Sequence, residues 1–310
     1  GFLLMLFLIS TLSWAQLSGI KTIPGDYATI SDAVNALNLQ GVGTGGVTFN
    51  VAANHTEVVP VGGILLTATG TATNPIVFQK NGVGANPILS RTDAGSITTS
   101  TLGGQGDAVV IIEGSDFVTF DAIDIASSNQ GIEYGFYVRK VSATDGVKNL
   151  TIKNANITMT RGTSQYVVGI YSSNNVPSSS VSSAVGVTVT SEDGRNENLT
   201  FIGNTITNVF TGIVVRGFNH TVVPRNFYDQ NVVIGQLGAG NIITDFAGNA
   251  SATAYGIYTL YVNDLFVSYN NINNQPGVGA GFTNIGYGIF TSTANSVNTT
   301  ITNNVITLKS

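Results

Sequence analysis

The chain consists of short apolar runs separated by polar bends, and one such segment recurs along it. Asn149-Leu-Thr-Ile-Lys-Asn-Ala-Asn-Ile-Thr158 holds two alternating runs joined by a tight polar bend. Alternation of apolar and polar positions predicts two short β-strands in each copy. In every copy, the last apolar residue of the first run lies five residues before the first apolar residue of the second. These pairs are Phe120/Ile125, Ile152/Ile157, Phe201/Ile206, Val267/Ile272 and Ile301/Ile306.

A second short motif, aromatic or aliphatic around a central glycine, alternates with the first. Taking Leu150, Leu199, Leu265 and Thr299 as anchors, the intervals are 49, 66 and 34 residues, and Val232 divides the 66 into 33 and 33. The 49-residue interval is therefore longer than the others and holds a serine-rich insertion near residues 172–197. A near-constant period with insertions at one place is typical of a stacked repeat protein. The glycine motifs are Tyr134-Gly-Phe-Tyr137, Val168-Gly-Ile-Tyr171, Thr211-Gly-Ile-Val214, Tyr255-Gly-Ile-Tyr258 and Tyr287-Gly-Ile-Phe290.

These repeats predict an all-β parallel solenoid. Each repeat has too few apolar residues to form a core alone, and stacking successive coils ~4.8 Å apart joins the equivalent strands into parallel sheets. The bends then align as well, so that Asn204, Asn270 and Asn304 occupy one column, interrupted by Ala155 and Ile123. Stacked asparagines bond to one another across coils, and the column is interpreted as a structural ladder.

One amphipathic helix is predicted before the repeats. Ile30, Ala33, Val34 and Leu37 have the spacing of one helix face. Thr29 with Asp32 gives an N-capping signal, and Gly41 follows as a stop. We expect this short N-terminal helix to cover the first coil, whose open edge would otherwise be exposed.

The expected organisation has three parts. Residues 1–15 have the apolar run and small-residue ending of a secretory signal peptide, truncated at its start, with a membrane anchor as the alternative. Residues 16–105 are expected to form the cap helix and the first irregular coils. Residues 106–310 are expected to form the regular repeats, truncated in mid-coil, and the mature chain is expected to lack a membrane span.

Composition narrows the class of partner. Only 9% of residues are charged, the net charge is −5, and the 12 Lys and Arg residues are scattered. A nucleic-acid partner is therefore not expected, because such proteins carry clustered basic residues. The chain has no cysteine, which excludes disulfides and cysteine-based metal sites.

The beginning of the chain resembles a known family. Tyr27-Ala-Thr-Ile-Ser-Asp-Ala-Val34, the segment Gly45-Gly-Val-Thr-Phe-Asn-Val51 and Thr56-Glu-Val58 resemble the start of right-handed parallel β-helix proteins of the pectin-lyase-like superfamily. They also resemble large secreted bacterial β-helix surface proteins. The resemblance implies a right-handed β-helix in a secreted or extracellular cell-surface protein of bacterial type. It implies little about activity, because many functions share this scaffold.

Catalytic members of the superfamily place acids and bases on the outer face of adjacent coils. The Gly-His-Gly and Arg-x-Lys motifs of its galacturonases are absent. Gly114-Ser-Asp-Phe-Val-Thr-Phe120 is similar to an esterase motif that contains a nucleophilic aspartate, but the final glycine is missing. Asp116 is therefore interpreted as a turn residue. No catalytic residue is assigned.

Other titratable residues are interpreted as structural or solvated. Asp121 and Asp124 lie three residues apart on a bend, and later repeats lack matching carboxylates, so that two ligands fall short of a Ca²⁺ site. Neither a metal site nor a cofactor is expected. The remaining candidates, interpreted as surface or loop residues, are His55, His220, Arg139-Lys140 and Glu192-Asp193.

The glycine motifs supply the most suggestive surface. Strand alternation with Phe136 facing inward places both Tyr137 and Gly135 on the outer face. The outcome would be a column of rings, Tyr137, Tyr171, Tyr258 and Phe290 with Val214 between them, beside a strip without side chains. Such a surface suits the flat face of a sugar. The alternative is an aromatic ladder that only stabilises the stack. If the inward and outward faces of these strands were exchanged, the glycine strip beside the rings would not exist.

The sequence therefore predicts a secreted or cell-surface β-helix module that is structural or binds ligands, such as an adhesin or glycan-binding protein. Its partner would be a polysaccharide or a cell-surface glycan. The alternative is a polysaccharide lyase or carbohydrate esterase acting on pectin-like polymers. An enzyme would need several acidic or basic side chains converging on adjacent outer positions. The pattern does not define the ligand or the oligomeric state.

Overall fold

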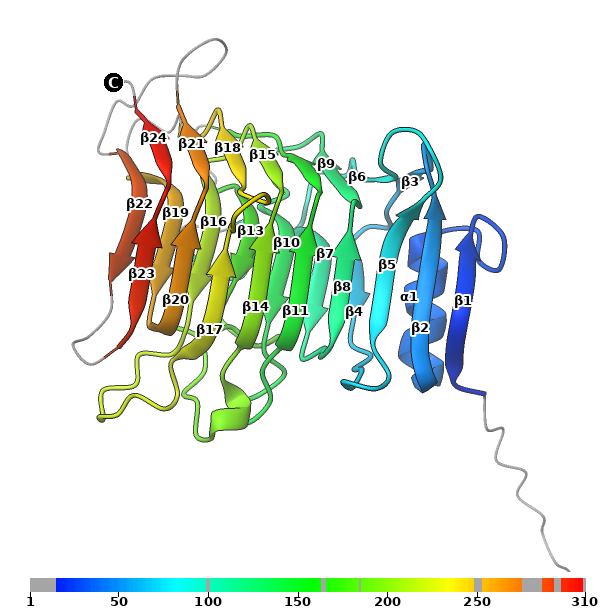
Figure 1. Ribbon diagram of the computed structural model, residues 1–310, viewed down its shortest axis with the longest axis horizontal. Coiled ribbons are helices and arrows are strands. Elements are labelled where there is room, and N and C mark those ends of the chain that lie inside the picture. Colours follow the sequence, from blue (N-terminus) through cyan, green and yellow to red (C-terminus); the bar gives the residue numbers. More distant parts are fainter. Residues whose placement is uncertain are drawn as a thin grey trace, which may run out of the picture.

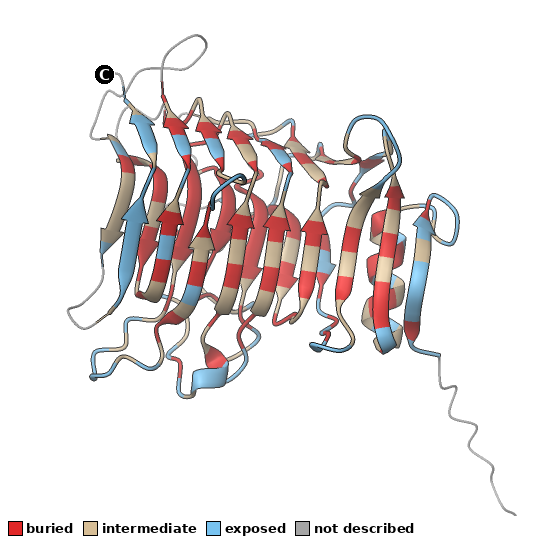
Figure 2. Cartoon of the chain, in the orientation of Figure 1, coloured by how far each residue is buried: buried red, intermediate tan, exposed pale blue. Residues whose placement is uncertain are grey.

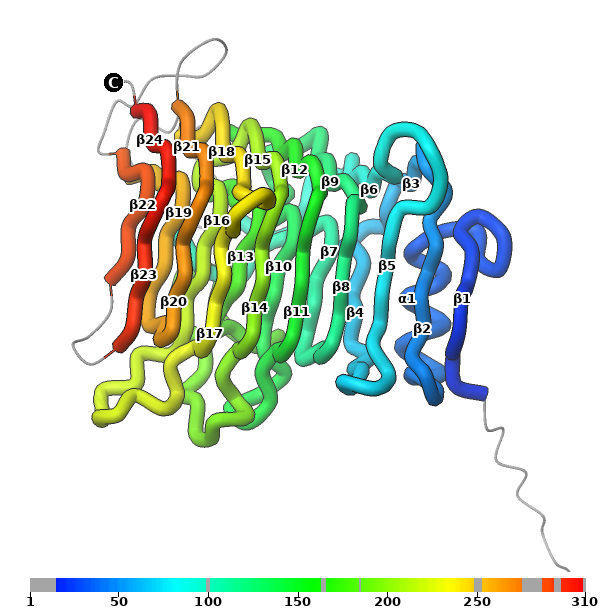
Figure 3. The backbone as a smooth tube through the Cα atoms, viewed as in Figure 1, coloured from blue at the N-terminus to red at the C-terminus, as the bar shows by residue number. Residues whose placement is uncertain are grey.

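The chain forms a right-handed parallel β-helix, in which the strands stack along the long axis of the molecule (Figure 1). The computed structural model describes residues 15–98, 101–162, 166–183, 185–247, 253–274, 286–292 and 297–308. Within these residues the strands form three sheets, and all pairs between named strands are parallel. The chain passes from sheet A to sheet B to sheet C and then begins the next coil, as the backbone trace shows (Figure 3). This confirms the fold that the repeats predict.

The strands of each sheet have the following bounds. Sheet A has nine described strands, β1 (Leu17–Ile23), β2 (Val42–Ala52), β5 (Ile76–Asn81), β8 (Val118–Asp121), β11 (Lys148–Lys153), β14 (Glu197–Ile202), β17 (Asp229–Ile234), β20 (Val262–Ser268) and β23 (Thr299–Thr302). Sheet B has eight, β3 (Thr56–Val58), β6 (Ile88–Arg91), β9 (Asp124–Ser127), β12 (Asn156–Thr158), β15 (Thr205–Thr207), β18 (Ile242–Thr244), β21 (Asn271–Asn273) and β24 (Val305–Thr307). Sheet C has seven, β4 (Ile64–Leu66), β7 (Ala108–Glu113), β10 (Tyr134–Arg139), β13 (Val168–Ser172), β16 (Thr211–Arg216), β19 (Ala254–Leu260) and β22 (Gly286–Ser292).

The repeated apolar pairs line one continuous core. Phe120 and Ile125, like the pairs of the next coils up to Val267 and Ile272, are at most 1% exposed. The last pair differs, since Ile301 and Ile306 are 42% and 45% exposed. Their strands β23 and β24 have a described neighbour on one side only, and β23 and β1 show most of the exposed surface of sheet A (Figure 2). At the N-terminal end the core contains a stack of rings from β2, β5 and β8, with centroids 4.6 Å apart for Phe49–Phe78 and 5.1 Å apart for Phe78–Phe120.

Helix α1 (Ile30–Gln40) covers the first coils, as predicted from its apolar spacing. Ile30, Ala33, Val34 and Leu37 are buried, and the helix packs against β1, β2 and β4. The Thr29 side chain accepts the Asp32 backbone N–H at 3.0 Å, as the capping signal predicts. The buried carboxylate of Glu57 accepts the N–H groups of Ile30 and Ser31 at 2.7 and 3.0 Å, placing negative charge at the helix N-terminus. None of the described helices is long and apolar enough to span a membrane.

The asparagine column forms the hydrogen-bonded ladder that the sequence predicts, with one member more. The Asn204 side chain donates to the Asn241 Oδ1 at 3.1 Å, and the Asn241 side chain donates to the Asn270 Oδ1 at 2.9 Å. Asn270 in turn donates to the Asn304 Oδ1 at 2.9 Å. At Ala155 the column ends, although the Ala155 N–H still bonds to the Asn204 Oδ1 at 3.1 Å.

Most of the predicted signal peptide lies outside the described residues. Of residues 1–15, the structure describes only Ala15. The signal peptide therefore stays a prediction, as do the proposed domain boundaries.

Candidate ligand-binding surface

The outer face of sheet C carries two columns of side chains because each strand bends at its glycine. A Cβ atom added to Gly135 would lie 2.5 Å from the carbonyl oxygen of Gly169 and 3.0 Å from the Ile157 side chain in the core. The same holds for the equivalent glycines, which face core isoleucines of sheet B. Only glycine fits this close approach. The prediction that the glycines form an open outer strip is therefore wrong.

The bend places the first residue of each glycine motif on the outer face. Phe136 packs in the core, as predicted, whereas Tyr134 and Tyr137 both belong to a second apolar cluster outside it. The pairing from coil to coil matches the first and third motif residues and omits the glycine, as in Tyr134↔Val168 and Phe136↔Ile170. Strict alternation predicts a column of glycines beside the rings on the outer face. The side chains of the first motif residues fill this place instead. These residues are Tyr134, Val168, Thr211, Tyr255 and Tyr287.

On strands β10 and β13, two loops cover the outer face of sheet C. Tyr134, Tyr137 and Tyr171 are 0% exposed, and the rings of Tyr137 and Tyr171 stack with centroids 5.4 Å apart. The hydroxyl of Tyr134 donates to the Gly104 carbonyl at 2.5 Å, and that of Tyr171 donates to the Gly103 carbonyl. Burial raises the pKa of Tyr137 and raises that of Tyr171 well above its ordinary value.

Asn175 completes this cover from the serine-rich insertion. Its side-chain amide donates to the Gly103 carbonyl at 3.1 Å and to the Tyr137 hydroxyl at 3.0 Å. The prediction that Tyr137 and Tyr171 lie on an open surface is therefore wrong, because two loops close over them. In this half of sheet C the rings stabilise the packing of the loops on the stack.

The other half forms a partly exposed aromatic platform, which we define as Tyr255, Tyr258, Tyr287 and Phe290. Ring centroids are 4.4 Å apart for Tyr255–Tyr258, 5.5 Å for Tyr255–Tyr287 and 5.4 Å for Tyr258–Phe290. Tyr287 is 36% exposed and the other three are partly exposed. Two predicted residues, Tyr258 and Phe290, thus belong to the platform, and the bend adds Tyr255 and Tyr287.

Arg216, the last residue of β16, lies beside the platform. Burial raises the pKa of the Tyr258 hydroxyl, and the positive charge of Arg216 opposes part of this rise. Within the described chain, the Arg216 guanidinium forms neither a hydrogen bond nor an ion pair. It lines a hollow of about 110 Å³ with Phe218, Asn219, Tyr261, Val185 and Gly217. A larger hollow of about 350 Å³, lined mainly by serines, lies within the insertion at residues 176–187.

Tyr255 provides a spectroscopic probe of the platform. Burial and the neighbouring rings of Tyr258, Tyr287 and Tyr166 raise the pKa of Tyr255 from 10.0 to about 12. An alkaline titration of phenolate absorbance should show a group with a midpoint near 12 that is lost in Tyr255→Phe. A pKa raised in the folded state adds stability below the unfolded-state value, and this stability falls as pH rises from 10.0 through about 12. Wild type should therefore lose more stability over this interval than Tyr255→Phe. Identical titration curves for the two proteins would contradict this placement of the ring.

The carboxylates considered as catalytic or metal-binding groups bond to neighbouring coils. Asp116 accepts the Lys148 backbone N–H at 2.7 Å, and burial raises its pKa. Asp121 pairs with Lys153 at 3.0 Å, and Asp124 accepts the Asn156 N–H at 2.7 Å. The described residues contain no group of three or more His, Cys, Asp or Glu side chains placed to hold a metal ion.

The remaining candidates occupy distinct surroundings. His55 lies 3.9 Å from Glu57, and His220 stacks on Phe227 with centroids 4.4 Å apart. Arg139 pairs with Glu113 at 2.6 Å. Glu192 and Asp193 are exposed and pair with Arg195 at 3.3 Å and Lys148 at 3.8 Å. The interpretation of Arg139-Lys140 as solvated loop charges is wrong, since Arg139 ends strand β10 with its side chain 11% exposed and the Lys140 side chain is 0% exposed.

Comparison with known proteins supports no closer assignment. No protein-family model and no curated protein sequence matches the chain. Among solved structures, a GH136 lacto-N-biosidase from Eubacterium ramulus aligns with 10% identity and a TM-score of 0.44, over 93% of this chain and 66% of that one, slightly less than two thirds. A rhamnogalacturonan lyase aligns with 13% identity and a TM-score of 0.35, over 91% of this chain and 86% of that one. Likenesses this weak carry no argument about ligand or activity, and the fold assignment rests on the three parallel sheets.

Proposed function

We propose that this chain is a carbohydrate-binding β-helix module of a secreted or cell-surface protein, and that it holds a glycan against the aromatic platform. The observation that carries the proposal is the group of four partly exposed rings on adjacent strands β19 and β22. Rings that are apolar on the face and polar at the hydroxyl suit sugars, which present both C–H faces and hydroxyl groups.

The surroundings of the platform fit this ligand class. The guanidinium of Arg216, which has no partner among the described residues, supplies donors beside Tyr258, and the exposed Asn219 lines the same hollow as Arg216. A polymer would lie across the coils, because the rings repeat from one coil to the next in register, as Tyr258↔Phe290 and Tyr255↔Tyr287. The proposal includes both an adhesin and a glycan-binding stalk.

Glycan retention by platform variants tests the proposal. Tyr258→Ala combined with Phe290→Ala should weaken retention on a polysaccharide array roughly tenfold, because two stacking contacts are worth about 1–3 kcal/mol. Phe266→Ala, which removes a ring that is 42% exposed on sheet A, is the matched control and should leave retention unchanged. Far-UV circular dichroism should show the same β-structure for all variants.

Retention that is equal in the platform variant and in wild type would reject the platform as the binding surface. The enzymatic alternative, a lyase or esterase on pectin-like polymers, makes a different prediction in the same array. It requires release of unsaturated or de-esterified products over time, whereas a binding module leaves the polymer intact.

A further inference from the structure

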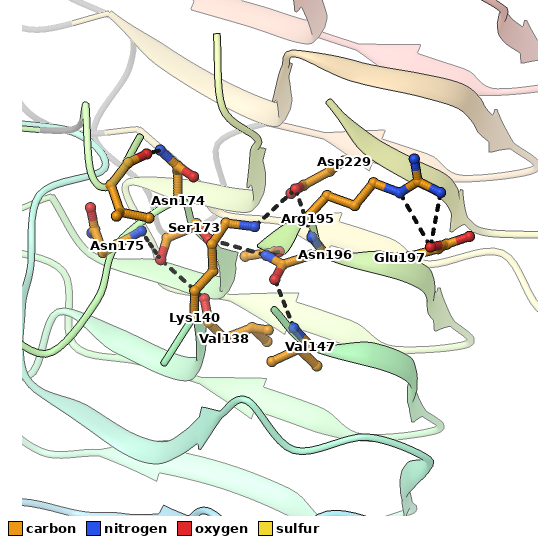
Figure 4. A network of polar contacts seen from close by, with 12 residues as sticks. Val138, Lys140, Val147, Ser173, Asn174, Asn175, Arg195, Asn196, Glu197 and Asp229 are labelled. Atoms are coloured by element: carbon orange, nitrogen blue, oxygen red, sulfur yellow. Dashed lines mark hydrogen bonds and ion pairs between the residues drawn. The ribbon is translucent and has the colours of Figure 1, made fainter. Parts of the chain in front are cut away.

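A buried ion pair lies where sheet C passes into sheet A. Lys140 directly follows β10, and Asp229 is the first residue of β17. Their side chains are both 0% exposed, and the Lys140 Nζ lies 3.2 Å from the Asp229 Oδ1 (Figure 4). The two residues are 89 positions apart in sequence. The lysine leads into β11, which is separated from β17 by the intervening strand β14.

The hydrogen bonds around the pair leave both groups poorly satisfied as ions. An ammonium has three N–H donors, yet Asp229 is the only described acceptor for the Lys140 Nζ. The Asp229 Oδ2 is buried and has no hydrogen-bond partner among the residues that the structure describes. Burial lowers the pKa of Lys140 and raises that of Asp229, although each charge opposes the shift of the other. These surroundings favour an amine and a carboxylic acid, which are the reactive forms for amide formation.

The carboxyl group is polarised and held in place. The Asn196 backbone N–H donates to the Asp229 Oδ1 at 2.9 Å, so that a donor already faces the oxygen on which negative charge would develop during attack at Cγ. The Asn196 side chain is itself fixed, donating to the Ser172 Oγ at 3.2 Å and the Ser173 carbonyl at 3.1 Å. The backbone of Gly217 packs against the same carboxyl, where an added Cβ would lie 3.1 Å from the Asp229 Cγ.

From this geometry we propose that Lys140 and Asp229 condense into an intramolecular amide that cross-links the two corners of the β-helix. The Lys140 Nζ attacks the Asp229 Cγ, an Nζ–Cγ bond forms and the Cγ–Oδ2 bond breaks. One amine proton joins the departing Oδ2 hydroxyl, and one water leaves. The amine and the acid are both in the chain, so that the step requires no oxidant, reductant or further reactant. The product replaces two buried ionisable groups by one neutral amide.

The cross-link would have a clear physical consequence. The chain has no cysteine and hence no disulfide. An amide between residues 140 and 229 closes a long loop and constrains the unfolded chain, as a disulfide does, but it resists reduction. It also ties together the two corners on either side of the corner that holds the serine-rich insertion. Such a bond suits a module that must keep its coils stacked outside the cell.

Mass spectrometry of the intact, denatured wild-type chain tests the proposal directly. We expect a mass lower than that of the sequence by one water, and a proteolytic fragment in which the peptide containing Lys140 is joined to the peptide containing Asp229. Lys140→Met should restore the full sequence mass. It also keeps a flexible apolar side chain of similar length in the buried site.

The peptide map distinguishes this bond from ordinary dehydration. Asp145-Gly146 and Asp193-Gly194 are both prone to lose water by closing a succinimide on a single linear peptide. Loss of water confined to those peptides, or a wild-type mass equal to that of the sequence, would overturn the proposal. A branched fragment that contains Lys140 and Asp229 would support it, whatever the glycan-binding behaviour of the platform.

Discussion

Replacing Phe78 by alanine is expected to destabilise the β-helix by about 3–5 kcal/mol, the range for large-to-small changes of buried aromatic residues. Phe78 is 0% exposed and lies between the rings of Phe49 and Phe120, at centroid distances of 4.6 and 5.1 Å. Its loss opens a cavity and interrupts the ring stack at the same time. Because β2, β5 and β8 are adjacent in sheet A, neighbouring coils cannot close this gap without shifting their register.

Chemical denaturation of wild type and Phe78→Ala, followed by far-UV circular dichroism, measures the effect. The matched control is Phe266→Ala, a ring in the same sheet that is 42% exposed. The control should change the free energy of unfolding by no more than about 0.5 kcal/mol. If the two variants lost equal stability, the stacked core would not be the main source of the stability of the fold.

The core could be predicted from the sequence because stacking converts local patterns into columns. Ile152 and Ile157, five residues apart, reappear in equivalent positions of later coils, and only a repeated fold gives such pairs one common environment. The helix was equally accessible, since the spacing from Ile30 to Leu37 and the capping by Thr29 are both local signals.

The outer face of sheet C was predicted only in part because strict alternation fails at a glycine bend. Tyr134 and Tyr137 face the same side although they are three residues apart, an odd spacing that alternation forbids. The aromatic residues at both ends of the motif in Tyr134-Gly-Phe-Tyr137 and Tyr255-Gly-Ile-Tyr258 are the signal that would have indicated the second column.

Burial by loops and by distant partners leaves no local signal. Tyr171 is covered by the carbonyl of Gly103, which lies 68 residues away, and Lys140 is buried against Asp229, 89 residues away. The pairing of these residues depends on how the long corners of successive coils fold over one another. The period of the strands contains no information on this, because the corners vary in length while the strands keep their register.

The sequence pattern does not place Asn241 in the ladder, for a related reason. In the neighbouring coils the ladder asparagine follows the last inward residue of the first strand by three positions, as Asn204 follows Phe201 and Asn270 follows Val267. In the coil of β17 the bend is longer, so that Asn241 follows Ile234 by seven positions. The column is restored in space because β18 still pairs in register with β15 and β21.

Replacing Asn241 by alanine is therefore expected to cost about 3–5 kcal/mol, since buried polar groups that lose their partners cost about 1–3 kcal/mol each. The Asn241 Oδ1 accepts the backbone N–H and the side-chain amide of Asn204 at 3.0 and 3.1 Å. Its own amide donates to the Phe201 carbonyl at 2.8 Å and to the Asn270 Oδ1 at 2.9 Å. Alanine removes both functions at a position that is 0% exposed, where water does not replace them.

Equilibrium unfolding in urea tests this expectation, with Asn271→Ala as the matched control. Asn271 lies next to the ladder residue Asn270 but faces the solvent, so that its removal should change stability by no more than about 0.5 kcal/mol. Hydrogen exchange adds a local measurement, because the Asn204 backbone N–H loses its acceptor only in Asn241→Ala and should exchange faster there. Unchanged protection of this amide would show that the ladder is not needed to hold the bends of adjacent coils together. A large loss in stability with rapid exchange would make the ladder a second source of stability beside the apolar core, acting through hydrogen bonds at a corner that apolar packing cannot define.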